Sequence, residues 1–145
     1  ILADWSEDAL RVCRQNIRRC ELTAQVSAAR ANALEPAPAA LWDFDLILCN
    51  PPYIPTGDLA GLDHSVRDYE PMLALDGGED GLDFYRAVTA GWKSALRPGG
   101  KLAFEVGYDQ APAVEYIMAE QGYEDIQTFQ DPGGHWRVGE GVLNE

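Results

Sequence analysis

The residues whose types and spacing most clearly suggest a chemical role are Asn50, Pro51, Pro52 and Tyr53, which follow the apolar run FDLILC at residues 44–49. The Asn50 side-chain oxygen and the Pro51 carbonyl oxygen could accept the two hydrogens of a planar NH2 group. Consecutive prolines restrict φ, so both acceptors would have fixed directions, and Tyr53 could stack on an amide or a base. The pattern predicts a site that presents an amide or amine lone pair to an electrophile.

A second candidate is Asp4, which ends the strand-like segment at residues 1–4. A carboxylate at the carboxyl end of an early strand can accept both hydroxyls of a ribose. Simpler interpretations remain open, because Asn50 could belong to an ordinary Asn-Pro turn and Asp4 to a turn or cap with Ser6. The order of a strand-end carboxylate followed by Asn50–Tyr53 favours a nucleotide-containing cofactor.

The elements that would position these residues alternate between strands and helices. This alternation predicts an α/β fold, a Rossmann-like doubly wound sheet that is mostly parallel and has an antiparallel edge strand. The apolar run at 44–49 is typical of a strand covered on both faces, and residues 54–80 resemble a lid or binding loop. Predicted strands cover residues 1–4, 26–30, 44–49, 101–106, 125–129 and 136–143, and predicted helices cover residues 7–20, 82–96 and 112–121.

Composition restricts the possible partners. The 145 residues, 46% of them hydrophobic, suffice for one domain spanning residues 1–145. The net charge of −13 disfavours a nucleic-acid partner. No apolar run reaches the length of a membrane span, so we expect no membrane partner and a cytoplasmic location.

Metal binding and disulfides are not predicted. Cys13, Cys20 and Cys49 have neither metal-ligand nor paired spacing, and we expect them to be small buried side chains. The acidic stretch DGGED at residues 76–80 lacks the ligand spacing of a calcium loop, which favours helix capping or solvation. Glu105 is expected near a strand end, with an open role.

Four stretches of the chain resemble the HemK/PrmC family of protein glutamine methyltransferases. The resemblance implies a class I S-adenosylmethionine-dependent methyltransferase fold. It also implies methyl transfer to the side-chain amide nitrogen of the Gly-Gly-Gln glutamine in a peptide-chain release factor, which would be the protein partner. The stretches are ADWSEDAL (3–10), FDLILCNPPYIPTGDL (44–59), VRDYEPMLALDGGEDGLDFYR (66–86) and LRPGGKLAFEVGYDQ (96–110).

The resemblance also implies residue roles. Asp4 would bind the cofactor ribose, and Asn50, Pro51, Pro52 and Tyr53 would hold the glutamine, with Asn50 also beside the cofactor. Asn32 and Ala33 would flank the adenine, where the family usually has an aspartate and often an aromatic residue, so these contacts would be weaker. Trp5, next to Asp4, could border the adenine or lie at the rim of the core. The segment DPGGHWRVGEGVLNE (131–145) departs from the family pattern.

The family's first strand and glycine-rich loop have no counterpart in these residues and would precede Ile1, so we interpret the chain as a fragment. The strands ending at Asp4 and Asn50 would then flank a gap, which could close, be filled by another chain, or reflect lost residues. We expect residues 1–145 alone to bind S-adenosylmethionine weakly or not at all. Two alternatives stay open: an enzyme acting on the exocyclic amine of a nucleobase, or an inactive fragment that serves as an interaction domain.

Overall fold

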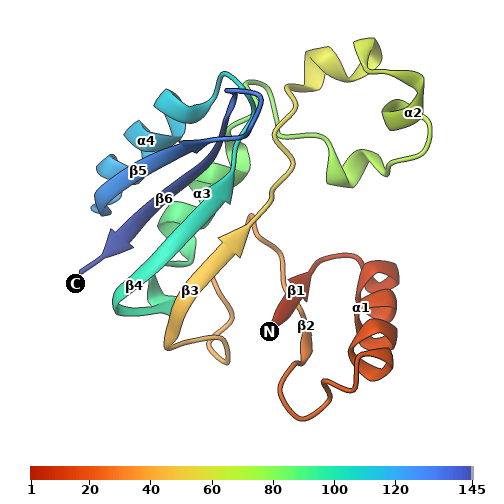
Figure 1. Ribbon diagram of the computed structural model, residues 1–145, viewed down its shortest axis with the longest axis vertical. Helices are drawn as coiled ribbons and strands as arrows, with labels where there is room; N and C mark the ends of the chain where they lie inside the picture. The colour runs from red at the N-terminus through yellow and green to blue at the C-terminus, as the bar shows by residue number, and fades with distance from the viewer. Residues whose placement is uncertain (145) are drawn as a thin grey trace.

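The computed structural model describes residues 1–144, and its strands form two sheets. Strands β1 (Leu2–Asp4) and β2 (Ala28–Arg30) make a parallel pair. The second sheet has the order β3-β4-β6-β5, with β3 parallel to β4 and both other pairs antiparallel (Figure 1). The predicted α/β class is confirmed. The bounds of the second sheet are β3 (Phe44–Cys49), β4 (Leu96–Glu105), β5 (Glu124–Gln130) and β6 (Trp136–Leu143).

The two sheets do not join through the described residues. Figure 1 shows the β1–β2 pair next to β3, on the side of β3 away from β4. Within residues 1–144, β1 pairs only with β2 and β3 only with β4. The strands that were expected to flank a gap therefore do not close up.

Helix α1 (Glu7–Arg19) follows β1 and confirms the prediction from capping and periodicity. The Ser6 hydroxyl oxygen accepts a hydrogen bond from the Ala9 N–H at 3.3 Å, which satisfies one free donor of the first turn. Acidic residues occupy the first turn and basic residues the last turn, as the helix dipole favours. Leu10 and Ile17 are the buried positions of its apolar face.

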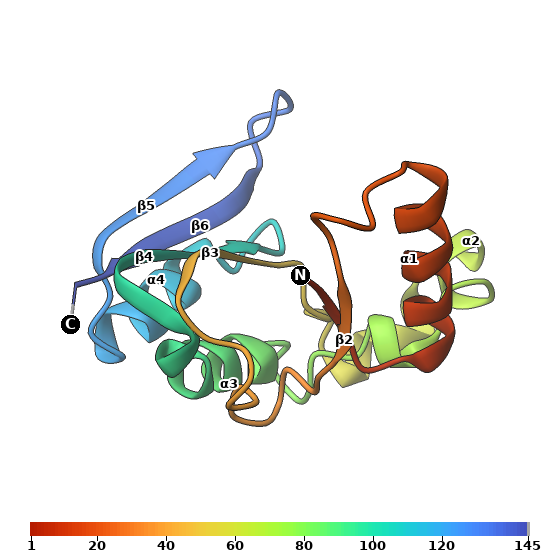
Figure 2. The same cartoon turned by 90° about the horizontal axis from the view of Figure 1, so that it is seen from below.

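Helices α3 (Asp83–Gly91) and α4 (Ala111–Glu120) cover one face of the four-stranded sheet (Figures 1 and 2). The core lies between them and the sheet, and includes Tyr85 and Phe104, whose rings meet edge to face at 5.1 Å. The opposite face of the sheet carries no helix (Figure 2).

Strand β3 differs from its prediction on that opposite face. Phe44, Ile47 and Cys49 pack against the core, but Leu46 and Leu48 are 47% and 75% exposed. Side chains alternate across a strand, so the apolar run buries only one of its faces within the described residues. The prediction that this strand is covered on both faces is therefore wrong for residues 1–144.

Helix α3 is shorter than the predicted span at residues 82–96. It ends at Gly91, whose carbonyl accepts a hydrogen bond from the distant Ala37 N–H at 3.0 Å. A 3-10 turn (Lys93–Ala95) then leads into β4. The RPGG residues lie inside β4 at an irregularity, since Phe44 pairs with Leu96 but Leu46 pairs with Lys101.

The stretch at residues 54–80 contains short helical elements. These are 3-10 helices at Thr56–Gly61 and Met72–Ala74 and the α-helix α2 at His64–Arg67. In the described part of the chain, no helix has the length and apolar character needed to cross a membrane. The same residues contain no cluster of potential metal ligands. The three cysteines are free, and they are less buried than expected: Cys20 is exposed, and Cys13 and Cys49 are half-buried.

Candidate active site

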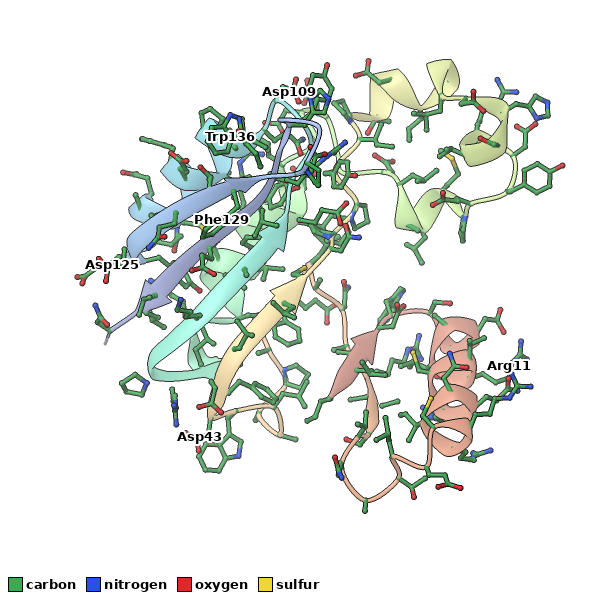
Figure 3. All side chains as sticks on the ribbon, viewed as in Figure 1. Arg11, Asp43, Asp109, Asp125, Phe129 and Trp136 are labelled. Carbon is green, nitrogen blue, oxygen red and sulfur yellow. The ribbon has the colours of Figure 1, made fainter. Side chains whose placement is uncertain are left out.

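The candidate site lies where the parallel strands β3 and β4 end. Asn50 directly follows β3, and Glu105 is the last residue of β4, so the two meet at one edge of the sheet. Both line a cavity of about 350 Å³ together with Leu48 and Val138. Figure 3 labels Asp109 and Trp136 at this end of the sheet, whereas Asp43 and Asp125 lie at the opposite end. The exposed Asn50 side chain is thus accessible to a ligand.

Tyr53 is held at both its ring and its backbone. Its hydroxyl donates a hydrogen bond to Glu105 Oε1 at 3.3 Å, and its carbonyl oxygen accepts one from Gln110 Nε2 at 2.9 Å. Burial raises the pKa of Tyr53, and the neighbouring Glu105 carboxylate raises it further. The phenol therefore stays protonated at neutral pH and remains a donor to Glu105.

Cys49 is the last residue of β3 and immediately precedes Asn50. Its side chain packs against the core under α3 and α4. Burial disfavours the thiolate and raises the pKa of Cys49 to about 12. The thiol is consequently protonated at neutral pH.

The acidic stretch at residues 76–80, for which helix capping or solvation was predicted, forms hydrogen bonds within its own loop, and α3 has no side-chain hydrogen bond at its N-cap. Asp76 Oδ1 accepts hydrogen bonds from the Thr56 hydroxyl at 2.7 Å and the Gly78 N–H at 3.0 Å. Asp80 Oδ1 accepts from the Leu82 N–H at 3.1 Å, and the same carboxylate pairs with Arg86. These hydrogen bonds lower the pKa values of Asp76 and Asp80. Both carboxylates therefore shape the loop that lies against Tyr53.

Asp4 lies at the carboxyl end of β1, where the sequence predicted it. Its Oδ1 accepts a hydrogen bond from the Ser6 N–H at 2.7 Å, which is the local turn that was the simpler interpretation. A carboxylate has lone pairs for several donors, so this hydrogen bond is compatible with ribose hydroxyls. Next to it, Trp5 is 44% exposed and carries the Arg30 guanidinium 4.2 Å from its ring centroid.

Asn32 and Ala33 follow β2, next to Asp4. The Ala31 N–H donates to the Asp4 carbonyl at 3.1 Å, which places the ends of β1 and β2 side by side. Asn32 Oδ1 accepts from the Leu34 N–H at 3.1 Å, and its Nδ2 donates to Glu35 Oε1 at 3.2 Å. Asn32 is therefore oriented by its own loop, while Ala33 packs against the core.

The structure brings Asn50, Pro51, Pro52 and Tyr53 together with Glu105 in one group, and Asp4, Trp5, Asn32 and Ala33 in another. Sequence reasoning missed Gln110, which contacts the first group from the start of α4. The available signal was a polar side chain at the edge of the apolar segment 111–118. It also missed Gly77 and Gly81, whose spacing in DGGEDG is their only local sign.

Comparison with known proteins gives one consistent family name. No family model matches the chain. A release factor glutamine methyltransferase of Clostridium acetobutylicum is 40% identical over 131 residues, which is 90% of this chain and 46% of that protein. A protein of the same name in Geobacter sulfurreducens is 53% identical over 95 residues, 66% of this chain and 34% of its own length.

Solved structures agree on the fold. A methyltransferase from Pyrococcus furiosus superposes with a TM-score of 0.69 at 19% identity, covering 99% of this chain and 61% of its own. TrmN from Thermus thermophilus gives a TM-score of 0.59 at 20% identity, covering 97% of this chain and 35% of its own. The chain spans about half the length of the curated relatives it matches. The family resemblance read from the sequence is therefore confirmed: over this span the chain is a relative of the release factor glutamine methyltransferases.

Proposed function

We propose that the protein containing this chain transfers a methyl group from S-adenosylmethionine to the side-chain amide nitrogen of a protein glutamine. The observation that carries the proposal is the irregular Asn50–Tyr53 segment, which directly follows β3 and is anchored through Tyr53. The names of the relatives support a glutamine acceptor rather than the exocyclic amine of a nucleobase. Residues 1–145 would then belong to one methyltransferase catalytic domain.

The acceptors in this turn suit a carboxamide. The Asn50 side-chain oxygen and the Pro51 carbonyl oxygen would each accept one N–H of the substrate NH2 group, and Tyr53 would stack on its plane. An amide nitrogen is a poor nucleophile because its lone pair is delocalised. Holding both hydrogens turns the lone pair toward the reacting carbon, so orientation rather than a strong base would lower the barrier.

The residues at the ends of β1 and β2 would hold the cofactor. Asp4 would accept from the ribose hydroxyls, while Asn32, Ala33 and Trp5 would border the adenine. When bound, S-adenosylmethionine supplies a sulfonium-activated methyl group, and the new N–C bond is balanced by loss of the thioether leaving group and of one amide proton. Asn50 would also lie beside the cofactor, since it ends the strand nearest to β1.

The protein partner in this proposal is a peptide-chain release factor, with its Gly-Gly-Gln glutamine as the acceptor. The family resemblance and the names of the relatives support this choice. Release of peptide chains takes place in the cytoplasm, so the protein would act there.

The test is incorporation of labelled methyl from S-adenosylmethionine into a purified release factor by the intact protein, with the modified residue identified by mass spectrometry. Label on the Gly-Gly-Gln glutamine supports the proposal. A release factor with that glutamine replaced by alanine serves as the matched control. If the cofactor binds but no label is transferred, or if the control is labelled equally, the proposal fails.

A further inference from the structure

The Gln110 side chain connects three loops beneath the Asn50–Tyr53 turn. Its Nε2 donates to the Tyr53 carbonyl at 2.9 Å and to the Gly81 carbonyl at 3.3 Å. Its Oε1 accepts from the Gly107 N–H at 3.0 Å. The Tyr85 hydroxyl lies 3.3 Å from the same oxygen and shares its single proton with the Glu105 carbonyl, which is closer at 3.0 Å. Segments far apart in the sequence are therefore fixed to one another by a single carboxamide.

Only a glutamine amide satisfies all of these partners. Gln110 is 9% exposed, so its polar atoms depend on protein partners. Both N–H donors of the amide have carbonyl acceptors, and the amide oxygen accepts from the Gly107 N–H and lies within reach of the shared Tyr85 hydroxyl proton. A carboxylate of the same shape would place an acceptor against two carbonyl oxygens.

Two glycines bring the loop at residues 76–82 into backbone contact with the same turn. A Cβ added to Gly77 would lie 2.7 Å from Tyr53 Cα and 2.9 Å from the Pro52 carbonyl oxygen. A Cβ added to Gly81 would lie 2.4 Å from the Tyr53 carbonyl oxygen and 2.8 Å from Gln110 Nε2. Any other residue at these positions would push the Pro52–Tyr53 backbone away.

Backbone hydrogen bonds fix Ile54, the residue directly after Tyr53. The Ile54 N–H donates to the Leu75 carbonyl at 3.1 Å, and the Gly77 N–H donates to the Ile54 carbonyl at 2.9 Å. On the other side, Pro51 and Pro52 restrict φ. Since Tyr53 has its carbonyl and its ring anchored, the peptide planes just after Asn50 have little freedom to rotate.

We propose that Gln110 is a positioning residue that fixes the direction of the Asn50 and Pro51 acceptors through the Tyr53 carbonyl. This inference rests on the proposed function, because it assigns a role to that same site. Gln110 lies behind the turn and acts through Tyr53, so its effect is on the orientation of the substrate amide. Loss of that orientation lowers the rate of methyl transfer more than it weakens binding of either substrate.

The experiment compares Gln110→Glu and Gln110→Met with the wild type in the intact protein. Gln110→Glu keeps the shape and replaces the donor with an acceptor, while Gln110→Met keeps the length without hydrogen bonds. We expect kcat for release factor methylation to fall about 100-fold in Gln110→Glu and about tenfold in Gln110→Met. The Kd for S-adenosylmethionine and the KM for the release factor should change by less than about threefold in both variants.

Hydrogen exchange gives a readout that does not depend on activity. The amides of Ile54 and Gly77 should exchange faster in both variants, while those of α1 should be unchanged. Gln25→Glu, on an exposed loop, makes the same charge change away from the site and should leave both readouts at wild-type values.

Two results would overturn the inference. One is an unchanged kcat in Gln110→Glu; the other is loss of cofactor binding in parallel with kcat in both variants, which indicates a general structural role. If Gln110→Glu does not fold, Gln110→Met decides by the same criteria, and failure of both to fold also counts for the structural role. The wild type separates this inference from the proposed function: without methyl transfer by the wild type the function fails, whereas a normal wild type with normal variants refutes only the role of Gln110.

Discussion

The candidate site residues at the ends of the two sheets are held in different ways. At the end of β3, the Asn50–Tyr53 turn is fixed by partners from distant parts of the chain, such as Glu105 and Gln110. At the ends of β1 and β2, the side chains of Asp4 and Asn32 form hydrogen bonds to residues two or three positions away. Tertiary contacts therefore preorganise the Asn50–Tyr53 segment. The Asp4 and Asn32 side chains are oriented only by their local turns within residues 1–144.

The largest expected effect is on kcat, after a change in the preorganised Asn50–Tyr53 segment. Replacing Asn50 with alanine removes one of the two oxygen acceptors, so kcat for methylation should fall about 100-fold or more. The side chain is exposed, so the free energy of unfolding should change by less than about 0.5 kcal/mol. Radiolabel transfer and urea unfolding measure the two quantities. Asn16→Ala, on the exposed surface of α1, is the control, and equal activity of both variants would contradict the proposed geometry.

The second largest expected effect is on cofactor binding at Asp4, the residue that ends β1. Asp4→Ala should raise the Kd for S-adenosylmethionine about tenfold or more, because the proposed charge-assisted hydrogen bond to a ribose hydroxyl would be lost. At saturating cofactor, kcat should stay near the wild-type value, in contrast to Asn50→Ala. Calorimetry on the intact protein measures the Kd. Asp8→Ala, an exposed carboxylate on α1, is the matched control, and a Kd equal to that of the control would remove Asp4 from the cofactor site.

The third effect tests the backbone contact under Tyr53. Gly81 has φ +74°, and an added Cβ would meet the Tyr53 carbonyl oxygen, so Gly81→Ala should destabilise the fold by about 2 kcal/mol. Gly57→Ala is the control, since nothing lies within 4 Å of its Cβ position. Urea unfolding of both variants checks the difference. Equal midpoints would show that the loop at residues 76–82 does not press on the turn.

The smallest effect at neutral pH concerns the buried phenols of Tyr85 and Tyr123, which lie in the part of the described chain that contains β3–β6. Burial raises the pKa of Tyr123 to about 12 and raises that of Tyr85 above its usual range. The unfolded chain loses these protons near pH 10 and the folded chain only at higher pH, so their stabilising contribution is complete below about pH 10 and is lost as pH rises toward 12.

Unfolding free energies measured between pH 8 and pH 11.5 check this slope. Tyr123→Phe should make the decline shallower, while Tyr116→Phe, whose side chain is exposed, should leave it unchanged. A slope that is the same in all three proteins would mean that Tyr123 does not titrate differently in the folded state.

Features that depend on neighbouring residues could be predicted from the sequence. The cap at Ser6, the carboxylate at the end of β1 and the position of Asn-Pro-Pro-Tyr directly after β3 all follow from local rules of helix ends and strand ends. For the acidic stretch at residues 76–80, helix capping or solvation was predicted, and its aspartates accept hydrogen bonds from nearby N–H groups of their own loop rather than capping α3.

Features that depend on distant contacts could not be predicted. Where α3 ends, the Gly91 carbonyl accepts a hydrogen bond from Ala37, which is far away in the sequence. Gln110 reaches the Tyr53 carbonyl across 57 residues, and no periodicity reports such a contact. Likewise, an apolar run does not tell whether both faces of its strand are covered, which is why the exposure of Leu46 and Leu48 was missed.

The high pKa of Cys49 has a consequence for selectivity. An ionised sulfur directly before Asn50 would be far more nucleophilic than any carboxamide and could capture an activated methyl group itself. Burial raises the pKa of Cys49 to about 12, so the sulfur stays protonated at pH 7. The hydrophobic burial of this one side chain would thus protect the protein from alkylating itself.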